Sequence, residues 1–165
     1  MKFKCEHRFA GLTQAQYEDL YFDEDFNIAL CKEVGLARTL LRREIQAGKL
    51  RRDVKVGADR EIPPAAAKIL GASKIEYTET VDYTMGSFRG TWSTLSSVMT
   101  DKVDSRGTFA FQPSGDGVNR MIEGDVTVKI PFVGGVVEKF IIADVEKSYE
   151  KAAEFTRRWL ASHPR

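Results

Sequence analysis

The sequence has 165 residues, of which 42% are apolar and 30% charged, and its 25 Lys and Arg side chains outnumber its 24 Asp and Glu side chains by one. This length corresponds to about one domain, so residues 1–165 are expected to form a single domain with a sizeable hydrophobic core. The composition excludes disordered, collagen-like and disulfide-scaffold proteins, and the near-neutral charge argues against a protein whose whole surface binds nucleic acid.

The sequence shows no pattern typical of a signal peptide or a membrane helix, and it contains two cysteines. Charged residues at every second position from Lys2 to Arg8 leave no apolar core for a signal peptide. No stretch approaches the roughly 18 apolar residues of a membrane helix, so we expect a cytoplasmic protein. Cys5 and Cys31 are far apart in the chain and are expected to be reduced and buried.

The first third of the chain predicts a strand followed by two short helices. Residues 2–10 alternate charged and apolar side chains, with the period of a half-buried strand that turns His7 inward. Thr13 is a typical N-cap for a helix that reaches Phe22. A second helix is expected over 23–35, because acidic residues open it and a glycine closes it.

Residues 36–57 predict a hairpin whose turn lies at 46–49. In the expected register the numbers of paired residues sum to 95, which sets Leu41 opposite Val54 and Thr39 opposite Val56 on the inner face.

One pair on that face breaks the apolar pattern, because Arg43 lies opposite Arg52. Two like charges in this position are unfavourable unless water or an anion lies near them. Both are therefore candidates to hold the carboxylate or phosphate of an amphiphilic ligand, with solvation near the hairpin tip as the alternative.

The rest of the chain predicts more strands and one long helix. Residues 113–117 are interpreted as a turn between two strands, because no phosphate-binding sequence follows them. A short helix is expected within 62–71, strands at 74–84, 89–100, 107–112 and 118–130, and a helix of roughly 45 Å from Pro131 to Ser162.

The junction Ile-Pro-Phe-Val-Gly-Gly-Val-Val-Glu-Lys-Phe-Ile at 130–141, together with this order of elements, resembles an uncharacterised bacterial branch of the START/SRPBCC (Bet v 1-like) superfamily. We expect Pro131 to preset the start of the helix, and Gly134 and Gly135 to allow its first turn to pack closely on the sheet.

The resemblance implies an α+β helix-grip fold. In this fold a seven-stranded curved antiparallel sheet carries two short helices after strand one, and a long C-terminal helix packs across it. It also implies a cavity between sheet and helix, which in relatives holds lipids, sterols, polyketides and other apolar molecules. Some relatives are enzymes, including polyketide cyclases.

Our leading hypothesis is non-catalytic binding of a hydrophobic or amphiphilic, lipid-like small molecule in that cavity. Neither metal-ligand spacing nor a nucleophile motif is present, so no metal or cofactor is expected. Glu79 and Arg43 are the expected polar anchors. The expected lining is Tyr77, Tyr83, Trp92, Phe109 and Phe111 on strands and Val137, Ile141, Val145 and Tyr149 on the helix.

Two alternatives stay open. The first is a cyclase or hydratase that uses Glu79 or His7 as its acid–base group. Burial favours the protonated form of an unpaired inward carboxyl, although pairing with Arg43 or Arg52 or access to solvent would remove this effect. His7 is otherwise a hydrogen-bonded core residue, and His163 near the end of the chain is solvated.

The second alternative is an interaction module. Residues 38–60 hold eight basic and three acidic side chains, net +5, whereas 16–33 hold one basic and six acidic, net −5. One interpretation is that the basic hairpin 38–60 binds anionic partners such as RNA or a membrane surface, and the other is that its charges pair across strands and with the acidic helices. No aromatic pattern typical of nucleic-acid binding accompanies it, so no nucleic-acid partner is expected.

Overall fold

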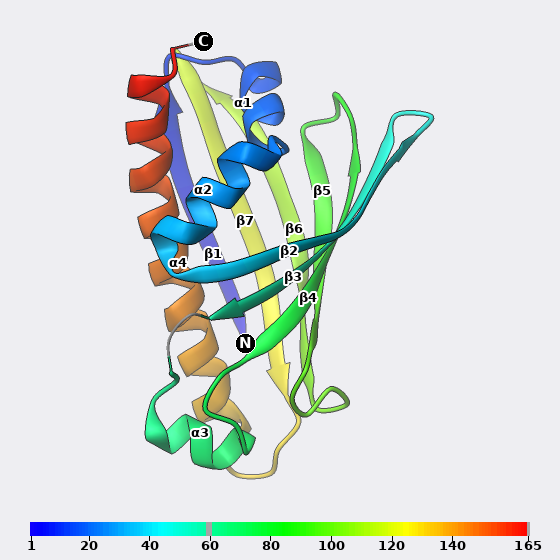
Figure 1. Cartoon of the computed structure of the whole chain (residues 1–165), viewed down its shortest axis with the longest axis vertical. Helices are drawn as coiled ribbons and strands as arrows, with labels where there is room; N and C mark the ends of the chain where they lie inside the picture. Colours follow the sequence, from blue (N-terminus) through cyan, green and yellow to red (C-terminus); the bar gives the residue numbers. More distant parts are fainter. Residues whose placement is uncertain (59–60, 165) are drawn as a thin grey trace.

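One antiparallel sheet curves around a long C-terminal helix (Figure 1). The computed structural model describes residues 1–58 and 61–164. The seven strands are β1 (Lys2–Ala10), β2 (Leu36–Gln46), β3 (Lys49–Ala58), β4 (Glu76–Thr84), β5 (Arg89–Ser96), β6 (Val103–Ser114) and β7 (Gly117–Val128). They are hydrogen-bonded in the order β1-β7-β6-β5-β4-β3-β2, which leaves β1 and β2 at the edges and confirms the predicted fold class.

The helices are α1 (Gln14–Tyr21), α2 (Glu24–Val34), α3 (Pro64–Leu70) and α4 (Gly134–Ser162). Thr13 caps α1 with a capping box, and Asp23 caps α2 by accepting a hydrogen bond from the Phe26 amide. Gly35 ends α2 in the left-handed conformation that glycine favours. Both short helices after β1 are therefore where capping residues predict them.

A β-bulge changes the predicted register of the β2–β3 hairpin. From Arg42 to the turn the paired numbers sum to 95 as predicted, but the register shifts by one residue between Leu40 and Arg42. Leu40, and not Leu41, faces Val54. The prediction assumed an uninterrupted ladder, and a bulge inserts one unpaired residue into one strand.

The bulge also changes which residue enters the interior. Arg38, and not Thr39, faces Val56, so a charged residue takes the inward position that we expected to be filled by threonine. The Arg38 side chain is only 6% exposed and forms an ion pair with Glu24 of α2. This ion pair joins the acidic helix to the basic hairpin.

Helix α4 begins three residues later than predicted. Pro131 lies in a turn with Phe132, which has a φ of +66° and is fully exposed, so proline does not start the helix. A Cβ atom on Gly134 would lie 2.2 Å from the carbonyl oxygen of Val128, whereas one on Gly135 would have no atom within 4 Å. Close packing of the first turn on the sheet therefore requires Gly134 alone.

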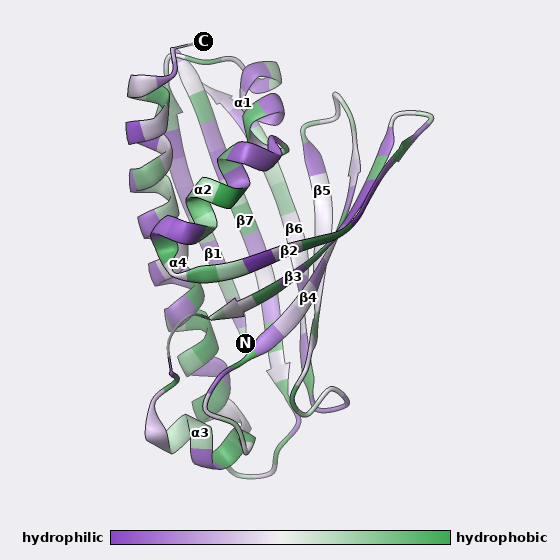
Figure 2. Cartoon of the chain, viewed as in Figure 1, coloured by the Kyte–Doolittle hydropathy of each residue, from purple (hydrophilic) through white to green (hydrophobic). Residues whose placement is uncertain are grey.

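Helix α4 packs on β7, β1 and α2. Its buried residues occur along its length: Gly134, Val137, Ile142, Ala152, Ala153 and Thr156. Figure 2 shows hydrophobic and hydrophilic residues alternating along the helix, as an amphipathic helix requires. Within the described residues, no helix has the length and apolar character of a membrane span.

The close approach of Gly134 predicts a position-specific cost. We expect Gly134→Ala to lower the free energy of unfolding by about 1–3 kcal/mol, because its methyl group would collide with the Val128 carbonyl. Urea denaturation measures this difference. The matched control Gly135→Ala meets open space and should leave stability unchanged or raise it, since alanine favours helix. Equal effects of the two substitutions would contradict the packing described here.

Candidate functional site

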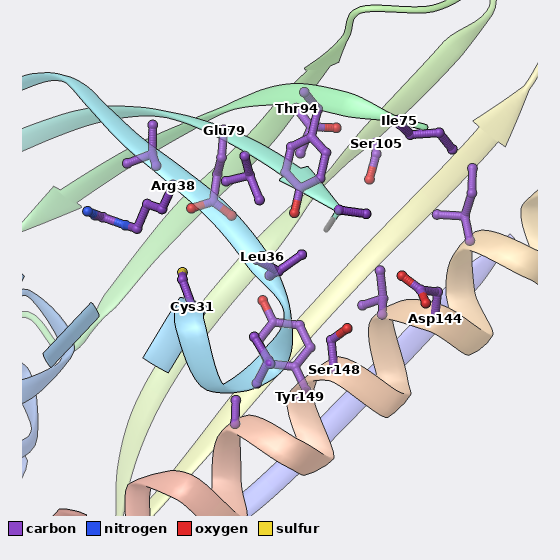
Figure 3. A pocket seen from close by; sticks show the side chains of 18 of the residues that line it. Cys31, Leu36, Arg38, Ile75, Glu79, Thr94, Ser105, Asp144, Ser148 and Tyr149 are labelled. Atoms are coloured by element: carbon purple, nitrogen blue, oxygen red, sulfur yellow. The ribbon is translucent and has the colours of Figure 1, made fainter. Parts of the chain in front are cut away.

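A cavity of about 530 Å³ lies between the inner face of the sheet, α2 and α4. Its volume falls in the range of roughly 300–1,000 Å³ that is typical of small-molecule sites. Figure 3 shows the carboxylate of Glu79, the thiol of Cys31 and the ring of Tyr149 pointing into this space from β4, α2 and α4. The middle of α4, from Phe140 to Tyr149, forms the wall opposite the sheet.

Most of the wall is apolar. Phe3, Trp92 and Val126 contribute from the sheet, and Ile141 and Val145 from α4. Three lining residues, Glu61, Pro63 and Lys147, are exposed to solvent, which places an opening between the β3–α3 connection and α4. An apolar chamber that opens to solvent suits a molecule that enters from water and buries an apolar body.

Six of the predicted lining residues lie on this wall, and they come from β4, β5 and α4: Tyr77, Glu79, Trp92, Ile141, Val145 and Tyr149. Each is partly exposed, in agreement with a side chain that borders empty space and not a packed core. Cys31 also lines the cavity, so of the two free thiols only Cys5 is buried as predicted.

Three predicted residues lie instead in a solid aromatic core. The rings of Tyr83 and Phe109 stack at 5.7 Å, and Phe111 meets Tyr17 edge-on at 4.8 Å. Helix α1 covers this part of the sheet and fills it with its own tyrosines (Figure 1). The prediction of a cavity along the whole inner face was therefore too broad, because α1 removes one end of it.

Val137 is also absent from the cavity wall. It is fully buried in α4, about one turn after Gly134. The close approach of that turn to the sheet leaves no space between them. The cavity opens only farther along the helix, from Phe140 onward.

The predicted anchor Arg43 is exposed and does not line the cavity, whereas its cross-strand partner Arg52 does. Figure 1 shows the reason, since the outer part of the β2–β3 hairpin projects beyond the rest of the sheet. Arg52 is only 6% exposed, and its Nη2 lies 3.7 Å from Oε1 of Glu79. Of the two partners considered for Glu79, Arg52 is thus the one observed.

Two further buried arginines line the cavity, and both were missed in the sequence. Arg38 was missed because the bulge cannot be read from alternation. Arg120 of β7 is 3% exposed and occupies the same inward row as Val118 and Ile122, a signal that was present in the sequence. An arginine inside an apolar row at period two marks a charged group directed at the interior.

These arginines have unused hydrogen-bond donors. Among the described residues, Nε and Nη1 of Arg52, Nη2 of Arg38 and Nε of Arg120 are buried without a protein partner, as is the indole N–H of Trp92. A buried donor without a partner costs about 1–3 kcal/mol, and more when it is charged. A ligand or water molecule that reaches these donors would remove this cost.

Tyrosine hydroxyls complete the polar lining. Burial raises the pKa of Tyr21, Tyr77 and Tyr149 above the ordinary tyrosine value, and the nearby Glu79 carboxylate adds to this effect in all three. These groups are therefore protonated at neutral pH and can donate or accept hydrogen bonds.

His7 lies behind the cavity wall. Its Nδ1 accepts a hydrogen bond from Arg120 at 3.0 Å, and its Nε2 contacts Glu150 at 2.9 Å. Burial lowers the pKa of His7, although the Glu150 carboxylate opposes this shift. A neutral ring with the proton on Nε2 satisfies both contacts. His7 and Glu79, the two acid–base candidates, therefore do not converge on the cavity.

Ion pairs account for several charges of the basic hairpin. Arg42 pairs with Glu44 at 2.7 Å, and Lys55 pairs across strands with Glu76 at 3.2 Å. Cross-strand pairing was one of the two interpretations of this segment. Binding of an anionic partner through the hairpin stays a prediction.

Among the described residues no cluster of His, Cys, Asp and Glu side chains is arranged to hold a metal ion.

The lowered pKa of His7 predicts a pH-dependent stability. Below the ordinary histidine pKa of about 6.5, the unfolded chain binds more protons at this position than the folded chain. The free energy of unfolding therefore decreases as the pH is lowered. We expect His7→Gln to flatten this dependence in urea denaturation between about pH 7 and pH 5. The control His163→Gln removes the exposed histidine and should keep the wild-type slope. An unchanged slope in His7→Gln would contradict the assignment.

The solved structures that this chain resembles share its fold. TTHA0849 from Thermus thermophilus superposes with a TM-score of 0.69 at 19% identity, over 98% of this chain and 99% of that one. The Zhui aromatase/cyclase from Streptomyces sp. R1128 gives 0.65 at 10% identity, over 98% and 96%. A START superfamily protein from Mycobacterium smegmatis gives 0.56 at 17% identity, over 97% of each chain.

No curated protein matches the sequence. A family model does match, over residues 6–160, and its family is described as "Protein of unknown function (DUF2505)". The chain therefore belongs to the DUF2505 family, and it has the helix-grip fold of the START/SRPBCC superfamily.

Proposed function

We propose that this protein binds a hydrophobic or amphiphilic small molecule in the cavity between the sheet and α4. The observation that carries this proposal is the cavity itself, about 530 Å³ with mostly apolar walls and an opening beside α4. Protein interiors are normally packed without voids of this size. An unfilled chamber of this kind costs dispersion contacts, so its persistence favours a molecule that fills it.

The energetics suit an amphiphile of modest size. A ligand that buries roughly 300 Å² of apolar surface gains about 7 kcal/mol from the hydrophobic effect. Loss of translational and rotational freedom offsets several kcal/mol of this gain. Micromolar affinity needs a net of about 8 kcal/mol, so polar contacts must add to the apolar burial. The arginines and tyrosines of the wall are available for those contacts.

The geometry supports binding better than catalysis. Acid–base chemistry of the cyclase or hydratase type needs positioned proton donors and acceptors that converge on the substrate. Glu79 lines the cavity but faces Arg52, and His7 lies outside it. The likeness to the Zhui aromatase/cyclase lies in the fold at 10% identity and does not carry that reaction to this chain.

A cavity-filling substitution tests the proposal. Ser105 of β6 lines the cavity, whereas Ser93 of the neighbouring strand β5 is exposed. We expect wild type to bind the neutral apolar dye N-phenyl-1-naphthylamine with an increase in dye fluorescence. Ser105→Trp should weaken this binding at least about tenfold, because the indole takes the dye's space, and Ser93→Trp should leave it unchanged.

Two results would count against binding in this cavity. One is a wild-type protein that gives no fluorescence increase with the dye. The other is equal affinity of wild type, Ser105→Trp and Ser93→Trp, which would place the dye somewhere else on the molecule. Thermal denaturation of each variant checks that the indole at Ser105 has not unfolded the protein.

A further inference from the structure

We infer that the ligand is an amphiphile with an oxyanion head, and that Arg52 on the inner face of β3 binds this head. The inference rests on the proposed function and adds the chemical class of the ligand and the residue that recognises it. Arg38 and Arg120 also line the cavity near Arg52, because Arg38 and Arg52 both act on the Cys31 thiol and Arg120 and Arg52 both act on the Tyr21 hydroxyl. The apolar part of the ligand would then lie along Trp92, Ile141 and Val145.

The Arg52 guanidinium is buried, and neighbouring aromatic rings fix its position. Its residue is 6% exposed, and the guanidinium carbon lies 5.4 Å from the ring centroid of Phe22 and 5.9 Å from that of Tyr21. Stacking over aromatic faces fixes the plane of the group. A guanidinium that is already oriented loses little entropy when it binds an anion.

The protein satisfies Arg52 only in part. Nε and Nη1 have no partner among the described residues, although both are buried at the cavity. The 3.7 Å separation between Nη2 and Oε1 of Glu79 exceeds the usual hydrogen-bond range of about 2.7–3.2 Å. Glu79 therefore balances the charge of Arg52 without occupying its donors. An oxyanion is the group that a guanidinium fork binds best.

The charges around Arg38, Arg52 and Arg120 leave an excess of one positive charge. Arg38 is paired with Glu24 and Arg52 with Glu79, whereas Arg120 contacts the neutral ring of His7, so three cations face two carboxylates and 3 − 2 = +1. The exposed Glu150 carboxylate lies beyond His7.

The other charged groups of the wall are Asp144 and Lys147 on α4, which have opposite signs, and the exposed Glu61 at the opening. Figure 3 shows Asp144 at the end of the view away from Arg38. The cavity therefore has a cationic end and a largely apolar remainder. This asymmetry matches an amphiphile whose head is anionic.

The binding of three twelve-carbon amphiphiles tests the inference. Dodecanoate, dodecyl phosphate and 1-dodecanol share one alkyl chain and differ in the head group, and each is titrated against bound N-phenyl-1-naphthylamine near neutral pH. We expect at least one of the two anions to displace the dye about tenfold more tightly than the alcohol, a difference of about 1.4 kcal/mol. The tighter of the two anions identifies the head as carboxylate or phosphate.

Arg52→Met and its cross-strand partner Arg43→Met form a matched pair. We expect Arg52→Met to lose most of the preference for the anion over 1-dodecanol, because the variant lacks the guanidinium that binds an anionic head more tightly than a hydroxyl. Arg43→Met removes the same charge from an exposed position and should behave as wild type.

Glu79→Gln gives a readout that a folding defect cannot imitate. It removes the carboxylate that competes with the ligand for Arg52, so we expect the anion to bind more tightly than to wild type and its preference over 1-dodecanol to increase. A gain of affinity in one variant and a loss in the other would assign the head to Arg52.

The failures are distinguishable. If wild type does not bind the dye in the cavity, the proposed function itself is wrong. If the dye binds but none of the three amphiphiles displaces it, the inference is overturned while the cavity stays a binding site. If alcohol and anions bind wild type equally, or if Arg52→Met and Arg43→Met bind the anion alike, the cavity is a binding site but the inference of an anionic head on Arg52 is overturned.

Discussion

The way in which α4 is held against the curved sheet is the constraint on which the rest of the structure depends. At the start, Gly134 lets the helix backbone approach the Val128 carbonyl more closely than any other residue would allow. Toward the end, Ala153 is fully buried, and Phe155 and Trp159 pack against Phe26 of α2. Between these attachments Ile142 is buried as well, whereas Ile141, Val145 and Tyr149 border the cavity. The helix therefore closes one side of the cavity without filling it.

The same geometry explains why charge is tolerated inside the molecule. A buried cation is costly in a packed core, but here each inward arginine borders a chamber that water or a ligand can occupy. Arg38 and Arg52 are each paired with a carboxylate, which lowers the cost while the chamber is without a ligand. Their N–H groups without a protein partner are the groups that we propose to bind the anionic head of a ligand. Stability and ligand recognition thus depend on the same few side chains.

Much of this fold can be predicted from local patterns in the sequence. Capping residues mark α1 and α2, and alternation along β3 and β4 places Arg52 and Glu79 inside. Tertiary effects decide what local patterns cannot. The bulge after Leu40 brings Arg38 inward, the cover formed by α1 turns Phe109 and Phe111 into solid core, and the projection of the hairpin leaves Arg43 in solvent. Each of these depends on contacts between elements that are distant in the chain.

A crystal structure of the wild-type protein with bound dodecanoate is the most direct test of the central claim, which is that the chamber under α4 binds an amphiphile by its head. The account predicts density for the alkyl chain between the sheet and the middle of α4, with a carboxylate oxygen within hydrogen-bond distance of Arg52. A middle of α4 that has closed onto the sheet, or dodecanoate bound only outside the cavity, would contradict it.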